Sequence, residues 1–86
     1  MNYPINTPAQ VRGVLRALRQ SRGLSQTEVG QLLGVSQKRV ARIEAAPERT
    51  SFDQISRLVT LLGGRVVIED ATPIENKAQK TVGTNW

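Results

Sequence analysis

Apolar residues recur at helical spacing along most of the chain, and the first predicted helix begins near its N-terminus. Its apolar positions follow the i, i+3, i+4, i+7 rule, which places them on one face of a helix. They are Val11, Val14, Leu15 and Leu18. Thr7 and Gln10 are spaced as a capping box, and Pro8 suits the first helical position. Gly23 predicts the end of this helix, because glycine accepts the left-handed conformation found there.

Two short helices are predicted next. Ser25 and Glu28 form a second capping box, and Gly34 ends the second helix. The apolar face of this helix consists of Val29, Leu32 and Leu33. Ser36 caps the third helix. Its buried residues are Val40 and Ile43, with Val35 packing in the turn before it.

The connection between these two helices is too short for them to lie antiparallel. Three residues separate Leu33 from the first turn of the third helix, so the two helices are expected to cross steeply. Gly30 is small enough to let them approach closely. This spacing predicts a helix-turn-helix.

A polar loop from Pro47 to Thr50 precedes a fourth helix. Thr50 or Ser51 caps this helix, and Gly63-Gly64 ends it. Its apolar face consists of Phe52, Ile55, Leu58, Val59 and Leu62. The predicted fold is therefore mainly α, with a four-helix helix-turn-helix domain at residues 7–62 that follows an N-terminal arm at residues 1–6.

The segment Arg65–Glu69 changes character, because it holds the adjacent β-branched residues Val66, Val67 and Ile68. It predicts a short strand within a dimerisation segment at residues 63–70. A lone strand needs a partner for its N–H and C=O groups, and the helical remainder offers none. We expect antiparallel pairing with the same strand of a second subunit across a two-fold axis. The alternative is an unpaired extended linker, and the polar residues 71–86 are expected to form a flexible tail.

The composition excludes several classes of function. The 86 residues include no Cys and no His, which removes disulfides, thiol catalysis, Cys-based zinc sites and the commonest general base. The sequence also shows no phosphate-cradling glycine loop and no clustered carboxylates. We therefore expect no enzyme, no catalytic residue, no cofactor and no metal. The longest apolar run is Val66–Ile68, far below the roughly 20 residues that cross a membrane, so no membrane partner is expected.

The positive charge is concentrated in the helical half. Residues 1–49 carry eight basic and three acidic side chains, and residues 50–86 carry four of each, so the whole net charge of +5 lies before residue 50. Such a one-sided distribution is typical of nucleic-acid-binding proteins. A solvated basic surface that only aids solubility is the alternative.

The third helix offers a surface suited to a DNA groove. Gln37, Lys38, Ala41 and Arg42 share its outward face once Val40 and Ile43 are buried. Gln pairs with adenine edges in the major groove, and Lys or Arg pairs with guanine. At the start of the second helix, Gln26 and Thr27 offer backbone N–H groups to a phosphate.

The stretch LSQTEVGQLLGVSQKRVARIE, residues 24–44, resembles the helix-turn-helix of the phage-repressor-like (XRE/Cro) family in its S-Q-x-E-x-x-x-x-x-G-V-S-Q pattern. The resemblance spans about residues 8–62. It implies a DNA-binding set of Gln26, Thr27, Ser36, Gln37, Lys38, Arg39, Ala41 and Arg42. It also implies that Arg19 pairs with Glu44 and serves the fold. Arg12 and Arg16 are interpreted as solvated surface.

The layout of nearly the whole chain is similar to that of HipB-type antitoxins, including the P-x-x-T loop at Pro47–Thr50 and a terminal Trp. Members of that family repress their own operon and neutralise a HipA-type kinase toxin. The resemblance implies a homodimer on an inverted-repeat operator, in the cytoplasm and at the nucleoid of a prokaryotic cell. The alternatives are a stand-alone XRE-family repressor without a toxin and a protein-interaction module whose basic surface is incidental.

Trp86 is the single tryptophan and the last residue. Tryptophan is enriched at binding hot spots, so Trp86 is a candidate partner-binding residue that would insert into a pocket of the toxin. A frayed end, or packing of the indole on its own domain, is the alternative.

Overall fold

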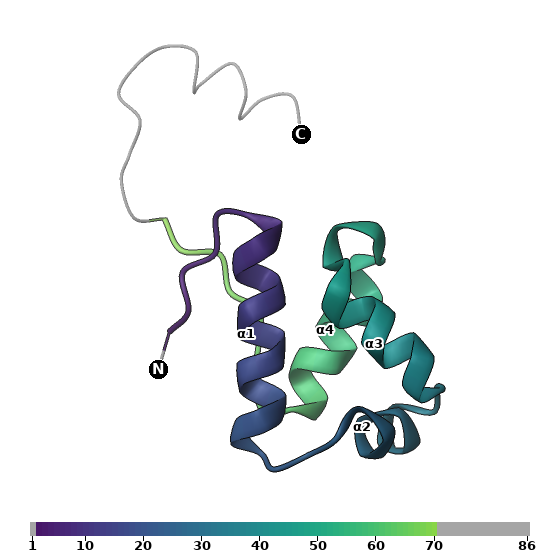
Figure 1. The fold of residues 1–86 in the computed structure, drawn as a ribbon. Helices are drawn as coiled ribbons and strands as arrows, with labels where there is room; N and C mark the ends of the chain where they lie inside the picture. Colours follow the sequence, from purple (N-terminus) through teal and green to yellow (C-terminus); the bar gives the residue numbers. More distant parts are fainter. Residues whose placement is uncertain (1, 71–86) are drawn as a thin grey trace.

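The computed structural model describes residues 2–70, and the predicted helices are present within them. They are α1 (Pro8–Ser21), α2 (Gln26–Leu33), α3 (Gln37–Ala45) and α4 (Phe52–Leu61), with a 3₁₀ helix, η1 (Pro47–Arg49), before α4. In the view of Figure 1, α1 and α3 flank α4, and α2 lies across one end. This arrangement confirms the mainly α, four-helix fold. None of the described helices is both long and apolar enough to cross a membrane.

Each of the four α-helices begins at a side chain that caps it. The Thr7 and Ser25 capping boxes are both formed, as predicted. Ser36 Oγ accepts a hydrogen bond from the Arg39 N–H at 3.1 Å, which starts α3. Of the two candidates for α4, Ser51 is the cap, because its Oγ accepts from the Gln54 N–H at 3.2 Å. These bonds satisfy N–H groups that have no carbonyl within the helix.

The buried core draws side chains from every α-helix. It consists of Leu15, Val29, Val40, Ile43, Leu58, Val59 and Leu62. Full burial of a side chain of this size contributes roughly 1.5–3 kcal/mol. All seven were predicted as apolar-face or buried residues, so the helical periodicity located the core correctly.

Two predicted core residues are in fact exposed. Leu32 is exposed because the buried face of α2 is the one that carries Val29 and Gly30, and α3 packs on that face. Phe52 is exposed because it is the first residue of α4, beyond the edge of the core. The segment predicted as a loop also has regular structure, since Pro47–Arg49 forms η1.

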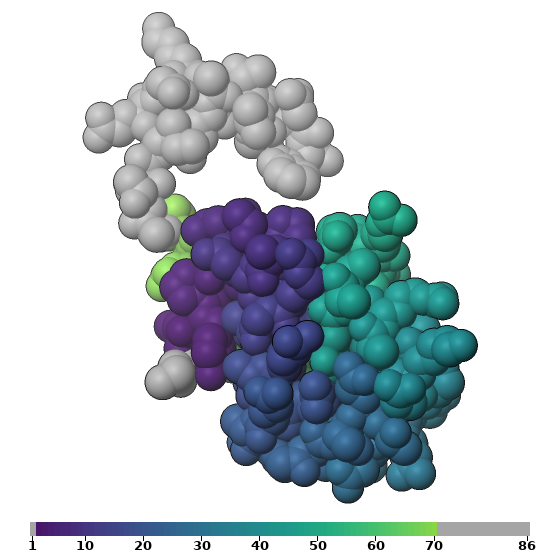
Figure 2. All heavy atoms as spheres, in the orientation of Figure 1, coloured from purple at the N-terminus to yellow at the C-terminus, as the bar shows by residue number. Residues whose placement is uncertain are grey.

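Residues 65–70 follow the Gly63-Gly64 turn and form no strand in the described single chain. Val66 and Val67 are exposed, and Ile68 is 96% exposed. Figure 2 shows this segment in green at one edge of the molecule. The purple N-terminal part of the chain lies between it and the teal surface of α3. The pairing predicted for this segment involves a second subunit and therefore stays a prediction.

Candidate nucleic-acid interface

The turn between α2 and α3 depends on the absence of a side chain at Gly30. A Cβ at this position would lie 2.7 Å from the Val35 carbonyl oxygen, closer than atoms of this kind pack. Gly34, at φ +81°, then directs the chain into α3. The glycine thus allows the close approach predicted from the sequence, and the turn sets the direction of α3.

The outward side of α3 carries polar and basic side chains. We call Gln37, Lys38, Ala41 and Arg42 the recognition face. Gln37, Lys38 and Arg42 are exposed, and Ala41 is half-buried between them. Among residues 2–70, neither Lys38 nor Arg42 has a carboxylate within ion-pair distance. The recognition face therefore presents an amide and two uncompensated cations to solvent.

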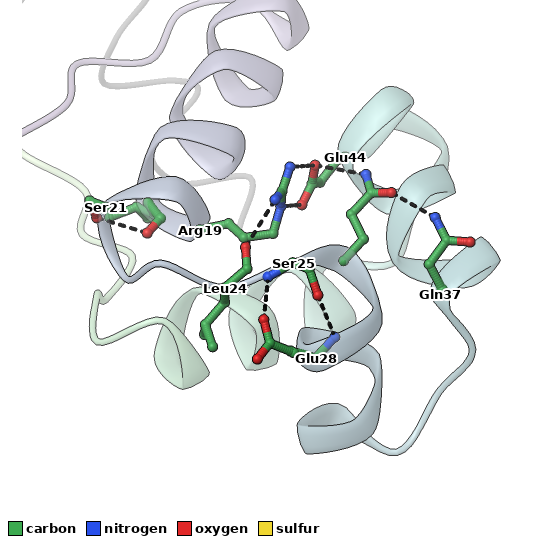
Figure 3. A network of polar contacts seen from close by, with 9 residues as sticks. Arg19, Ser21, Leu24, Ser25, Glu28, Gln37 and Glu44 are labelled. Carbon is green, nitrogen blue, oxygen red and sulfur yellow. Dashed lines mark hydrogen bonds and ion pairs between the residues drawn. The ribbon is translucent and has the colours of Figure 1, made fainter.

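A hydrogen-bonded network behind this face connects α1, α2 and α3 (Figure 3). Glu44, only 2% exposed, accepts from Arg19 Nε at 2.6 Å. Gln26 Nε2 donates to the same carboxylate at 3.1 Å, and Gln37 Nε2 donates to Gln26 Oε1 at 2.7 Å. We call Arg19, Glu44, Gln26 and Gln37 the Glu44 network.

The Glu44 network has two consequences. The predicted pair of Arg19 and Glu44 is present, and Arg19 also donates to the Leu24 carbonyl at 3.0 Å, so its guanidinium serves the fold. Gln37 is held by one amide hydrogen, and its side-chain oxygen points away from Gln26 in Figure 3. Gln37 is thus oriented with an acceptor and a donor still available.

An open hollow lies at the start of α2. Its lining residues come from α1, the α2 N-terminus and α3: Arg16, Arg19, Gln20, Ser25, Gln26, Thr27 and Gln37. The first N–H groups of a helix have no carbonyl partner within it and carry a partial positive charge. Because Arg16 also lines this hollow, the hollow combines a cation with helix N–H groups and has the chemistry of an anion site.

Arg16 was interpreted from the sequence as solvated surface, yet it lines this hollow. It lies three residues before Arg19, and residues at that spacing share one side of a helix. Once Arg19 was expected to reach α3, the spacing could have placed Arg16 beside the recognition face. Arg12, the other residue interpreted as solvated surface, has its Nη1 3.8 Å from Glu48 Oε1 in an exposed ion pair.

The remaining predicted site residues lie outside the recognition face. Thr27 and Ser36 are exposed at the first turns of α2 and α3. Arg39 is half-buried and donates to Gln54 Oε1, which ties α3 to α4. Trp86 lies outside the described residues.

The cap of α2 also lowers the pKa of Glu28. The Ser25 backbone N–H donates to Glu28 Oε1 at 2.9 Å, and Ser25 Oγ accepts from the Glu28 backbone N–H at 3.1 Å. The Ser25 backbone N–H, and after it the Ser25 side chain, favour the charged carboxylate and hold the pKa of Glu28 below its ordinary value. The start of α2 therefore keeps one fixed negative charge, which its helix dipole favours.

Comparisons with known proteins agree with this geometry. A family profile described as a helix-turn-helix domain matches residues 10–66, which is more than half of the chain. The chain is 23% identical over 82 residues to the antitoxin HipB of Escherichia coli O6:H1, covering 95% of this chain and 87% of that protein.

Two solved structures share the fold. One is a complex of a HipB variant with an O2 20mer, at a TM-score of 0.74 and 22% identity, covering 84% of this chain and 100% of that one. The other is a HipB–O4 20mer complex, at a TM-score of 0.72 and 23% identity, covering 80% and 97%. The resemblance to HipB-type antitoxins is thus confirmed as a likeness in sequence and in fold.

Proposed function

Because this chain belongs to the helix-turn-helix domain family, we propose that it is a sequence-specific DNA-binding protein that uses α3 to read an operator. The observation that carries the proposal is the recognition face. Its polar side chains are exposed, Lys38 and Arg42 have no carboxylate within ion-pair distance among residues 2–70, and the Glu44 network holds Gln37. The two similar HipB structures, each a complex with a 20mer, support it.

In this proposal α3 lies in the major groove. Gln37 pairs with an adenine, while Lys38 and Arg42 pair with guanines, each good pair supplying roughly 1–3 kcal/mol of discrimination. Ala41 leaves room for the groove edge or a thymine methyl. Since Gln37 is already oriented by Gln26, it loses less conformational entropy on binding.

Phosphate contacts flank the bases in the proposed complex. The α2 N-terminus, with Gln26 and Thr27, holds one phosphate in the hollow, and Arg16 approaches the same strand from α1. Ser36 lies at the first turn of α3 and contacts the backbone beside the groove. Arg39 keeps the N–H groups not used on Gln54 for a neighbouring phosphate.

We propose that the protein acts as a homodimer. Pairing of Val66, Val67 and Ile68 across a two-fold axis would cover side chains that are exposed in the single chain. Two recognition helices then bind half-sites about 34 Å apart on one side of the duplex. Two such half-sites need about 20 base pairs of duplex, or two helical turns, and the similar HipB structures are complexes with 20mers.

We further propose an antitoxin role, supported by the likeness to HipB over 95% of this chain. The protein would repress its own operon and neutralise a HipA-type kinase toxin, with Trp86 as a contact. Because toxin binding and operator binding would be coupled, repression would depend on the amount of toxin.

Selection of bound duplexes from a random library tests the DNA-binding proposal. We expect enrichment of an inverted repeat whose half-sites lie one helical turn apart. Binding without any enriched sequence, or no binding to duplex DNA, would contradict it.

Affinity capture from the native host tests the antitoxin role. The full-length chain should retain a kinase-like protein, and deletion of residues 80–86 should lower that retention while duplex affinity stays unchanged. Equal retention after the deletion would remove Trp86 from the interface. If no kinase is captured, a stand-alone repressor becomes the better description.

A further inference from the structure

Arg22 links the ends of two helices that are distant in sequence. It is the C-cap residue of α1, and its Nε donates to the Leu62 carbonyl oxygen at 2.8 Å. Leu62 is in turn the C-cap residue of α4. Among residues 2–70, no carboxylate lies within ion-pair distance of Arg22. The guanidinium is therefore directed at a helix end rather than at an acidic side chain.

The Arg22 side chain suits the end of α4. The last carbonyl groups of a helix have no N–H partner within it, and the helix dipole makes them partly negative. The last turn of α4 contains no basic residue of its own. Arg22 supplies both the missing donor and the missing positive charge from α1.

The same contact determines how the chain leaves α4. Gly63, at φ +85°, donates to Thr60 O at 3.0 Å, and the Gly64 N–H donates to Val59 O at 2.9 Å, which is a Schellman turn. A Cβ on Gly63 would lie 2.8 Å from a terminal nitrogen of Arg22. The guanidinium thus fills the space on the outside of this turn.

Immediately after this turn, Arg65–Asp70 runs exposed to solvent. The direction of that segment relative to α1 is set by the turn and by the side chain packed against it. Arg19 on the same helix bonds to Glu44 and so holds α3. Through α1, Arg22 therefore connects α3 to the segment that leaves the domain.

We propose that Arg22 is a positioning residue that sets which half-site spacing the dimer accepts. The inference rests on the proposed function, in which residues 63–70 join two domains on an inverted repeat. A dimer selects one spacing only if each domain is held in a fixed direction relative to the joint. Arg22 holds the domain to that joint without contacting the DNA.

Arg22→Met and Arg22→Lys, made in the full-length chain, test the proposal. Methionine keeps an unbranched apolar side chain but removes every donor, whereas lysine keeps the length, the charge and a donor for Leu62 O. The probes are the inverted-repeat duplex recovered by selection, the same duplex with its centre lengthened by one or two base pairs, and a single half-site.

The wild type should bind the selected duplex more tightly than the lengthened ones. In Arg22→Met this ratio of affinities should fall by about fivefold or more. Half-site affinity and dimer mass should not change, and Arg22→Lys should restore most of the preference. This pattern separates positioning from general destabilisation, because a merely structural role would change the melting temperature and leave the spacing preference intact.

Three results would overturn the inference. An unchanged spacing preference in a folded, dimeric Arg22→Met variant would refute the role of Arg22 and leave the proposed dimer intact. A fall in half-site affinity with unchanged spacing preference would make Arg22 a DNA contact instead. A wild type that is monomeric on a single half-site would refute the proposed dimer and this inference together.

Discussion

At the residue scale, Glu44 combines deep burial with a formal charge. Its carboxylate accepts from Arg19 and from Gln26, so the charge is both paired and hydrogen-bonded. Such a pair stabilises a fold little compared with an apolar core, but removing one partner leaves a buried charge uncompensated. The main effect of the Arg19–Glu44 pair is to position other side chains, because the same carboxylate orients Gln26 and, through Gln26, Gln37.

Replacing Arg19 by Met should therefore lower the free energy of unfolding by about 3 kcal/mol, because Glu44 loses its counter-charge. Urea denaturation measures this change. Arg57→Met is the control, since its exposed pair with Asp53 should contribute less than about 0.5 kcal/mol. Similar small losses in both variants would show that the Arg19–Glu44 pair is energetically unimportant.

Arg16 is the residue that the structure adds to the candidate site. Arg16→Ala should weaken binding to all duplexes alike and lower the slope of log affinity against log salt by about 1, because a phosphate contact releases counterions whatever the sequence. Binding titrations at several salt concentrations measure the slope. Arg57→Ala, which removes a cation from α4 outside the hollow, should leave the slope unchanged. Equal slopes for wild type and Arg16→Ala would exclude the contact.

At the element scale, α2 illustrates how caps hold a short helix. Its eight residues are too few for independent helix formation in water, so packing and the Ser25–Glu28 box must stabilise it. The box also places a carboxylate at the positive end of the helix dipole.

The lowered pKa of Glu28 predicts a pH dependence. Its carboxylate contributes stability above the ordinary carboxyl pKa of about 4.3, and that contribution is lost as the pH falls through the lower folded-state value. Glu28→Gln keeps a capping box without a titrating group. Urea midpoints should therefore favour the wild type near neutral pH and converge with those of Glu28→Gln below about pH 4. A difference that stays constant with pH would contradict this reading of the cap.

The same scale shows what the sequence could predict. The caps and glycine stops were found correctly because their chemistry is confined to a few adjacent residues. Leu32 and Phe52 were misplaced because periodicity gives a helix its face but not the neighbour that covers it. The bond from Gln37 to Gln26 joins side chains of two different helices, and no local pattern in a single sequence indicates such a contact. Arg16 was missed although its three-residue spacing from Arg19 places both on one side of α1 and so indicated its position in the hollow.

At the scale of the whole molecule, the surface of α3 and the proposed dimerisation segment lie at different edges of the helical domain (Figure 2). The domain between them includes α1, whose Arg19 and Arg22 connect to both sides. In the proposed complex, this arrangement would let one subunit contact DNA and a second copy through different surfaces.

The double variant Val66→Asp, Ile68→Asp should convert the dimer to a monomer, because two like charges would face each other across the paired segments and the apolar burial would be lost. Sedimentation velocity gives the mass. Replacing exposed Thr60 on α4 by Asp is the matched control and should leave the mass unchanged. An unchanged mass in the double variant would exclude pairing through this segment.

The central claim is that the outer side of α3 reads DNA bases. Affinity for the selected inverted repeat, compared between wild type and the triple variant Gln37→Ala, Lys38→Ala, Arg42→Ala, tests it most directly. The account predicts a loss of at least about a hundredfold for the selected sequence with little change in melting temperature, since all three side chains are exposed. Full affinity and undiminished sequence preference in the triple variant would contradict it.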